Sequence, residues 1–114
     1  GTNLENTVLT NAILNCVGHS VCVSTGSELS DKDLTGRDLS NRDLSGKDIT
    51  GAILSGANLS STDLSNTILT NATLTGADLT DAVLTGAILT GADLENAVLT
   101  GAILNCVGHH ICVS

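Results

Sequence analysis

Large aliphatic side chains recur at every fifth position along almost the whole chain. The spacing is clearest in residues 76–104, which contain Leu79, Leu84, Leu89, Leu94, Leu99 and Leu104. The same register extends back to Leu29 and reappears at Leu4, Leu9 and Leu14. A period of five matches neither the helical period of about 3.6 residues nor the strand period of two. The pattern therefore predicts one repeat array, a single domain spanning residues 1–114.

The residues around each central Leu are almost as regular. Ala usually stands two positions before the Leu, Ser or Thr follows it, and Gly or Asn often comes next. Units such as Ala57-Asn58-Leu59-Ser60 and Ala77-Asp78-Leu79-Thr80-Asp81 resemble the pentapeptide-repeat family. The resemblance implies an all-β fold, a right-handed quadrilateral β-helix with four pentapeptides per coil and about five coils. It also implies that each Leu, and the Ala two positions before it, points inward.

The composition agrees with such a narrow solenoid. Phe, Tyr, Trp and Met are absent, which suits a thin column that grows in length and not in width. One small and one large residue per side can fill that column at normal packing density. Twelve Gly residues supply corners, and the absence of Pro preserves the backbone donors that join successive coils.

Charge and hydropathy disfavour several functional classes. The net charge is −8 and the chain has only four Lys and Arg residues, so we expect no nucleic-acid binding. No apolar run approaches the length of about 18 residues that a membrane span needs. Ser and Thr belong to the repeat and no His or acid is paired with one of them at a catalytic spacing, so we expect no enzyme.

All four cations fall in four consecutive repeats, at the position where Ala points inward elsewhere: Lys32, Arg37, Arg42 and Lys47. Burying four unpaired cations in an apolar column would be costly. In one interpretation their side chains extend outward past the neighbouring Asp residues of a terminal coil. In the other they form a basic ring that docks on the acidic or carbonyl-rich end of another unit.

The residue just before each Leu should face solvent, and in several repeats it is a β-branched aliphatic residue. With four sides per coil, Ile68 should lie next to Ile88, and Val83 next to Ile103 on the adjacent side. Such ladders can reflect strand propensity alone. Alternatively, they form a lateral contact between rods, because contiguous exposed apolar surface usually has a partner.

The two ends of the chain are near duplicates. Residues 1–24 and 91–114 are identical at 18 of 24 positions, at an offset of 90 residues. Ninety residues correspond to four and a half coils of twenty, which would turn successive units by half a revolution. The chain is either a piece of a longer tandem array or a subunit whose ends imitate each other. Both possibilities predict propagation along one axis, with a junction near residues 25–30.

Each duplicated block contains a Cys/His segment in which the Leu register fails, because His19 and His109 take the Leu positions. An imidazole is costly in an apolar column, so the coil should loop out there. We favour local disulfides, Cys16 with Cys22 and Cys106 with Cys112, each of which requires a hairpin. Disulfides between units, or a metal held by these thiolates and imidazoles, are the alternatives. His110 replaces Ser20 and makes the two blocks chemically unequal.

The leading functional hypothesis is a structural protein that assembles with itself, end to end, into an extracytoplasmic fibre or sheath. It rests on the near-duplicate ends, the cysteines beside them and the absence of a recognisable cap. The cysteines indicate an oxidising compartment. The family resemblance offers an alternative, an acidic DNA mimic that binds a type II topoisomerase. A further alternative is a fibre that carries a Cys/His-bound metal or redox cofactor; no cofactor is the favoured expectation.

Overall fold

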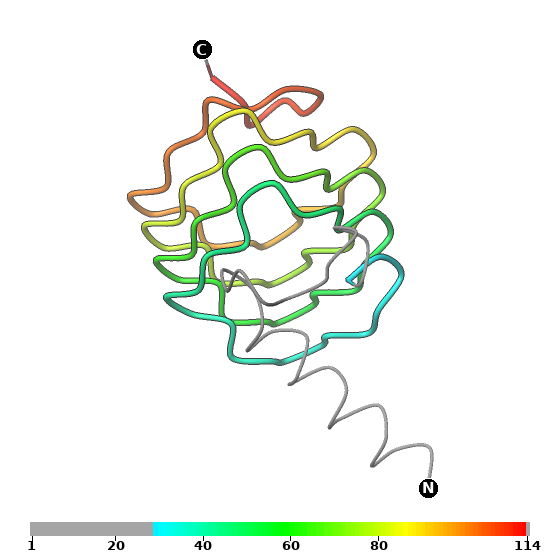
Figure 1. Cartoon of the computed structure of the whole chain (residues 1–114). Coiled ribbons are helices and arrows are strands. Elements are labelled where there is room, and N and C mark those ends of the chain that lie inside the picture. Colours follow the sequence, from blue (N-terminus) through cyan, green and yellow to red (C-terminus); the bar gives the residue numbers. More distant parts are fainter. Residues whose placement is uncertain (1–28, 114) are drawn as a thin grey trace, which may run out of the picture.

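The computed structural model describes residues 29–113, which form a stack of four-sided coils (Figure 1). Within these residues the secondary structure consists of isolated parallel β-bridges, one for each side of a coil. Eleven of the twelve bridges join residues that are 20 positions apart. We therefore divide the described chain into coil 1 (residues 29–48), coil 2 (49–68), coil 3 (69–88) and coil 4 (89–108).

Each corner of a coil is a tight turn built by one pentapeptide. The residue two positions after the central Leu or Ile has a positive φ at every repeat from 31 to 101, for example 60° at Asn71 and 71° at Gly51. The turn is closed by a hydrogen bond such as that from the Ala72 N–H to the Leu69 carbonyl, 3.0 Å. Gly, Asn and Asp dominate this position because they tolerate the left-handed conformation best.

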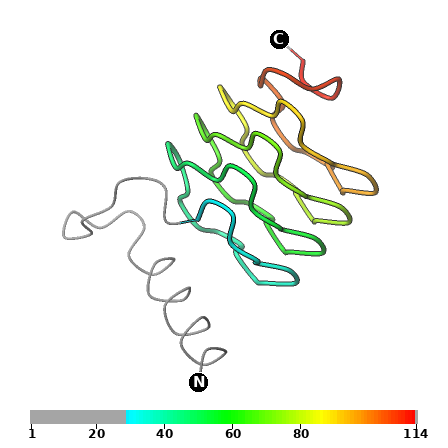
Figure 2. The same cartoon turned by 90° about the vertical axis from the view of Figure 1, so that its right-hand side faces the viewer.

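Successive coils are stacked side by side along one axis (Figure 2). Backbone hydrogen bonds join each coil to the next. The N–H of a central Leu donates to the coil above, as in Leu74 to Asp93 O at 2.7 Å. The preceding residue donates to the coil below, as in Ile68 to Lys47 O at 3.0 Å, and the corner residue Asn71 donates to Thr90 O at 2.9 Å. Three backbone bonds per side therefore hold neighbouring coils in register, although only one residue per side forms a bridge.

The interior is a column of aliphatic side chains, as the sequence predicts. The central Leu and Ile residues from Leu29 to Leu89 are at most 2% exposed, and the inward Ala residues of coils 2 and 3 are equally buried. Thr62 and Thr67 occupy two of the Ala positions and are fully buried. Their hydroxyls donate to Leu39 O at 3.0 Å and Leu64 O at 2.8 Å, so burial leaves neither hydroxyl unsatisfied.

The column is less well filled at its two ends. In coil 4 the central residues Leu94, Leu99 and Leu104 are only half-buried. Near the other end, a cavity of about 10 Å³ is lined by the central residues of coils 1 and 2 and by Leu69, the first of coil 3. That volume is at the lower limit for one water molecule, and its lining is aliphatic. The cavity adjoins the coil in which Lys and Arg replace the inward Ala.

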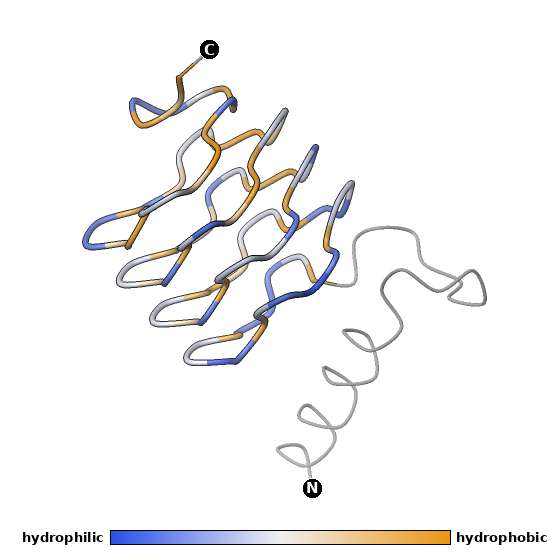
Figure 3. Ribbon diagram, turned by 90° about the vertical axis from the view of Figure 1, so that its left-hand side faces the viewer, coloured by the Kyte–Doolittle hydropathy of each residue, from blue (hydrophilic) through white to orange (hydrophobic). Residues whose placement is uncertain are grey.

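Hydrophobic and hydrophilic residues alternate along each coil, as expected for one inward and one outward surface (Figure 3). None of the residues 29–113 belongs to a helix with the length and apolarity needed to cross a bilayer. The total of about five coils and the role of the block at residues 1–24 involve residues outside the described part of the chain, so both stay predictions.

Replacing Leu69 by Ala tests the column. Leu69 is 0% exposed, so its truncation should lower the free energy of unfolding by about 2–5 kcal/mol, because a narrow solenoid cannot collapse around the cavity. Ile68→Ala is the matched control, since Ile68 is the adjacent residue and is 37% exposed. Chemical denaturation followed by circular dichroism measures both variants. Equal losses in the two would contradict the assignment of inward and outward positions.

Candidate functional site

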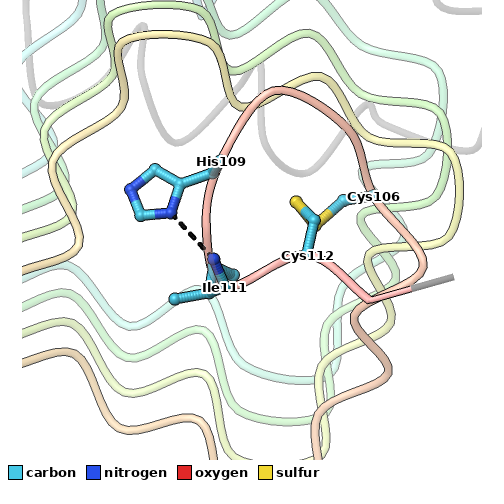
Figure 4. The surroundings of a disulfide bond; sticks show 4 residues. All are labelled: Cys106, His109, Ile111 and Cys112. Carbon is cyan, nitrogen blue, oxygen red and sulfur yellow. Dashed lines mark hydrogen bonds between the residues drawn. A yellow bond between two sulfur atoms is a disulfide. The ribbon is translucent and has the colours of Figure 1, made fainter.

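The C-terminal end of the stack carries a disulfide-closed loop at residues 106–112, which we call the end loop. The Sγ atoms of Cys106 and Cys112 are 2.03 Å apart and their Cα atoms are 5.0 Å apart (Figure 4). Cys106 is 8% exposed, and Cys112 and Ile111 pack partly against the core. The end loop therefore covers part of the top of the column, which makes it a partial cap that the sequence analysis did not expect.

The chain leaves the five-residue register within the end loop. Ile88 pairs with Val107, 19 positions on, whereas the lower bridges all span 20. The Cys106 and Val113 N–H groups both donate to Leu104 O at 2.8 Å, and Gly108 adopts a φ of 89°. The chain thus turns back on itself and brings the two cysteines together, in agreement with the loop-out that the sequence predicts at His109.

The two histidines of the end loop differ in their exposure to solvent. His109 is half-buried, and its Nδ1 accepts a hydrogen bond from the Ile111 N–H at 3.2 Å. His110 is exposed, and the centroids of the two imidazole rings are 4.4 Å apart. Within residues 29–113, no three His, Cys, Asp or Glu side chains gather as a metal site would require. The metal hypothesis involving His109 stays a prediction, as does the one for Cys16, His19 and Cys22, which lie outside the described residues.

Coil 4 also presents an edge of polar backbone groups. In coil 3, Leu74 N–H donates to Asp93 O at 2.7 Å, and the same bond recurs at the central residues below. Among residues 29–113, the corresponding N–H groups of coil 4 find no backbone acceptor; they belong to Gly91, Leu94, Asn96, Leu99, Gly101 and Leu104. The carbonyls of Ala92, Ala97 and Ala102, whose equivalents accept bonds lower down, receive none in this range either. We call this set of groups the open edge.

The four cations lie in coil 1, at the opposite end of the described stack. Lys32 is exposed, as expected if it extends outward. Arg37, Arg42 and Lys47 are half-buried, so they extend outward less fully than Lys32 does. Whether these cations dock on another unit stays a prediction.

The aliphatic ladders form as predicted. Ile68 is bridged to Ile88, and Val83 to Ile103 on the adjacent side. Ile68 and Ile88 are each 37% exposed and Ile103 is 48% exposed. The first ladder continues to Val107 in the end loop, which is 56% exposed. A lateral contact through these residues stays a prediction.

Many of the acidic residues have a structural role that the sequence analysis missed. Where Asp precedes the central Leu, its Oδ1 accepts hydrogen bonds from the residue after the Leu; Asp78 binds the Thr80 N–H at 3.0 Å and the Thr80 hydroxyl at 2.6 Å. These bonds hold the pKa of Asp78 below its ordinary value. The same bonds lower the pKa of Asp33, Asp38, Asp43 and Asp48. The recurring Asp-Leu-Ser/Thr triplet was the signal in the sequence.

Stability should therefore fall in acid. A carboxyl whose pKa is lower in the folded state stabilises the protein above its unfolded pKa of about 3.9, and this stabilisation is lost as the pH falls through the folded pKa. We expect the denaturation midpoint to drop between about pH 5 and pH 2. Asp78→Asn should lessen the drop, because Asn58 makes the same two bonds to Ser60 without titrating. An Asp78→Asn variant with unchanged acid sensitivity would contradict this role of the carboxylate.

Removing the disulfide should loosen the C-terminal end selectively. For a loop of this size, chain entropy gives an expected loss of about 2 kcal/mol in the free energy of unfolding for the double variant Cys106→Ser and Cys112→Ser. Hydrogen exchange should accelerate at Leu89, whose N–H donates to Val107 O, and stay unchanged at Leu64, whose N–H donates to Val83 O in the middle of the stack. Uniform acceleration along the whole chain would show that the end loop is not a local cap.

Known proteins share both the repeat of this chain and its four-sided fold. A profile of pentapeptide repeats aligns with residues 33–71 and 67–105, in eight copies. No curated protein sequence matches the chain significantly. Among solved structures, a pentapeptide-repeat protein from the thylakoid lumen of Arabidopsis thaliana is 28% identical over 82% of this chain and 66% of its own length, with a TM-score of 0.71.

Two further structures share the fold. HetL of the cyanobacterium Nostoc sp. strain PCC 7120, involved in the regulation of heterocyst differentiation, is 36% identical over 71% of this chain and 41% of its own, with a TM-score of 0.51. QnrB1, a plasmid-mediated fluoroquinolone resistance protein, is 22% identical over 69% of this chain and 49% of its own, also at 0.51. The chain thus spans less than two thirds of each of these proteins.

Proteins with these repeats form right-handed quadrilateral β-helices and generally serve as structural or binding proteins. The four-sided stack, the repeated corners and the profile match over more than half of the sequence agree with one another. The chain therefore belongs to the pentapeptide-repeat family.

Proposed function

We propose that this chain is a structural protein that assembles with itself, end to end, into a fibre or sheath. The open edge of coil 4 is the observation that carries the proposal. Its N–H and C=O groups recur at the spacing that joins coil 3 to coil 4 by hydrogen bonds. An edge of this kind pairs readily with another backbone unless a cap or charged side chains block it.

The side chains at the same end favour association as well. Leu94, Leu99 and Leu104 are half-buried, whereas their equivalents in coils 2 and 3 are at most 2% exposed. Covering a Leu side chain completely contributes about 1.5–3 kcal/mol relative to full exposure. A second unit stacked on this end would complete that burial and supply the missing backbone acceptors, and these gains would offset the entropy lost on association.

We place this assembly outside the cytoplasm. The support is the pairing of Cys106 with Cys112, because disulfides persist in oxidising compartments. The similar Arabidopsis protein comes from the thylakoid lumen, which is a compartment outside the cytoplasm.

Electron microscopy of the purified 114-residue chain, with and without reductant, tests the proposal. We expect rods much longer than one molecule. Leu99→Lys should abolish them, because it places a charge in the end surface. Val98→Lys should leave them intact, because Val98, the neighbour of Leu99 in the same repeat, is 45% exposed on the outer surface of the coil. Circular dichroism verifies that both variants fold.

Isolated particles of one or two chains would overturn the fibre. They would favour the topoisomerase-binding alternative, which draws support from charge: coils 2 to 4 contain Asp63, Asp78, Asp81, Asp93 and Glu95 but no Lys or Arg. An assay of topoisomerase activity with added protein would then test that function. Elemental analysis of the same preparation tests the cofactor-bearing fibre, which requires stoichiometric metal.

A further inference from the structure

We propose that two copies of this chain pack side by side, pointing in opposite directions, through one side of the stack. We call it the uncharged side. It contains the bridged ladder of Ile68, Ile88 and Val107 and the neighbouring residues Thr70 and Thr90. The proposed fibre joins the ends of the stack, whereas this contact joins its sides. It rests on the fibre only for the repetition that strengthens it.

The uncharged side differs from the other three sides in its charge. In coils 2 to 4 each of the others contains an acid: Asp63 on one side, Asp78 on the next, and Asp93 with Glu95 on the third. Among the described residues of these coils, the uncharged side contains no acid, Lys or Arg. Copies with a net charge of −8 repel each other. This repulsion is weakest when both copies present the side without charge.

The uncharged side also has a continuous exposed aliphatic ladder. Ile68 and Ile88 are each 37% exposed and Val107 is 56% exposed. Ile53, on another side, is 39% exposed, but both of its bridge partners are polar. Isolated exposed aliphatic residues are common on monomers, whereas contiguous ones usually have a partner. The ladder is therefore the part of the lateral surface that gains most from being covered.

The ladder is self-complementary. Its members stand one coil apart, about 4.8 Å, and a second copy has the same spacing. A two-fold axis that passes between Ile68 and Ile88 places Ile68 of each copy opposite Ile88 of the other, and Asp48 opposite Val107. Both copies then use the same surface, as in the two-fold contacts that are commonest among oligomers.

The charges at the two ends of the ladder select the direction. Asp48 is bridged to Ile68, and its hydrogen bonds to Thr50 lower its pKa, so this carboxyl is ionised at neutral pH. Lys47 beside it is half-buried. At the upper end, the end loop contains the exposed His110 and no acid. Copies that point the same way would bring Asp48 against Asp48. Opposite directions bring each Asp48 to the end loop of the other copy, where imidazole N–H groups can donate to the carboxylate.

The contact between two single chains is small. Five side chains of each copy form the uncharged side, whereas a stable interface buries about 800 Å² per partner. Along a fibre the same contact recurs with every copy, and linked weak contacts reinforce one another. We therefore expect rods to pair side by side, and isolated chains to pair only at high concentration.

Cross-linking at high protein concentration tests the arrangement directly. We would mix Asp48→Cys with Val107→Cys and add a bifunctional thiol reagent that spans about 10 Å, the spacing of packed sheets. Antiparallel packing should give at least fivefold more covalent dimer in the mixture than in either variant alone. Each mixed pair retains one contact between Asp48 and an end loop. Asp38→Cys mixed with Val107→Cys is the matched control, since Asp38 binds Ser40 as Asp48 binds Thr50 but lies on another side.

Electron microscopy of the assembled protein provides a second readout. Wild-type rods should pair side by side. Ile88→Lys should leave single rods, because it places a charge in the contact. Ile53→Lys is its matched control and should keep the pairs, since Ile53 has the same place in its repeat and nearly the same exposure, 39% against 37%, on another side.

The outcomes separate this contact from the fibre. Dimer formed by Asp48→Cys alone would indicate copies that point the same way and would overturn the proposal. Single wild-type rods without the mixed cross-link would overturn it too and leave the end-to-end function standing. Dispersed particles that give the mixed cross-link would support the lateral contact and overturn the fibre. Dispersed particles without it would overturn both.

Discussion

Backbone hydrogen bonding between successive coils is the constraint on which the rest of this structure depends. Each side of a coil shares three such bonds with the coil above, for example from Leu74 to Asp93 O, from Gly76 to Glu95 O and from Asp93 to Ala72 O, and their regular spacing requires twenty residues per coil everywhere below Val107. That requirement fixes a positive φ at every corner and hence the choice of Gly, Asn, Asp or Ser there. It also means that a stack in isolation ends on unsatisfied backbone groups, which is the physical basis of the proposed end-to-end assembly.

The structural role of each side chain depends on its position within the pentapeptide. Central Leu residues fill the column, and the residue before each Leu either forms an aliphatic ladder or, as Asp, binds the Ser or Thr two residues on. The acidic character of the chain is therefore in part a consequence of turn chemistry. Carboxylates such as Asp78 contribute to folding as well as to surface charge, so acidity alone is weak support for mimicry of DNA.

The two ends of the described stack are chemically different. Coil 1 places cations where other coils have Ala, and a small cavity lies beside them. Coil 4 ends in half-buried Leu residues and in N–H groups that have no backbone acceptor among the described residues. The end loop, closed by the disulfide between Cys106 and Cys112, covers part of this end. Unlike ends favour head-to-tail contacts over two-fold pairing, and head-to-tail contacts that do not close on themselves generate filaments.

The sequence by itself determined the repeat length of five residues. The inward positions and the pairing of Ile68 with Ile88 followed from the four-sided coil that the resemblance to the pentapeptide-repeat family implied. The sequence also indicated that the register breaks at His109, since imidazole does not suit an apolar column. Only the tertiary structure decided how the end loop folds back to Leu104 and that Leu99 in coil 4 stays half-buried. It also decided that the Asn66 side-chain oxygen occupies the space that a Cβ atom on Gly86 would need. These features depend on contacts between coils twenty residues apart and on the point at which stacking stops, which a local pattern does not contain.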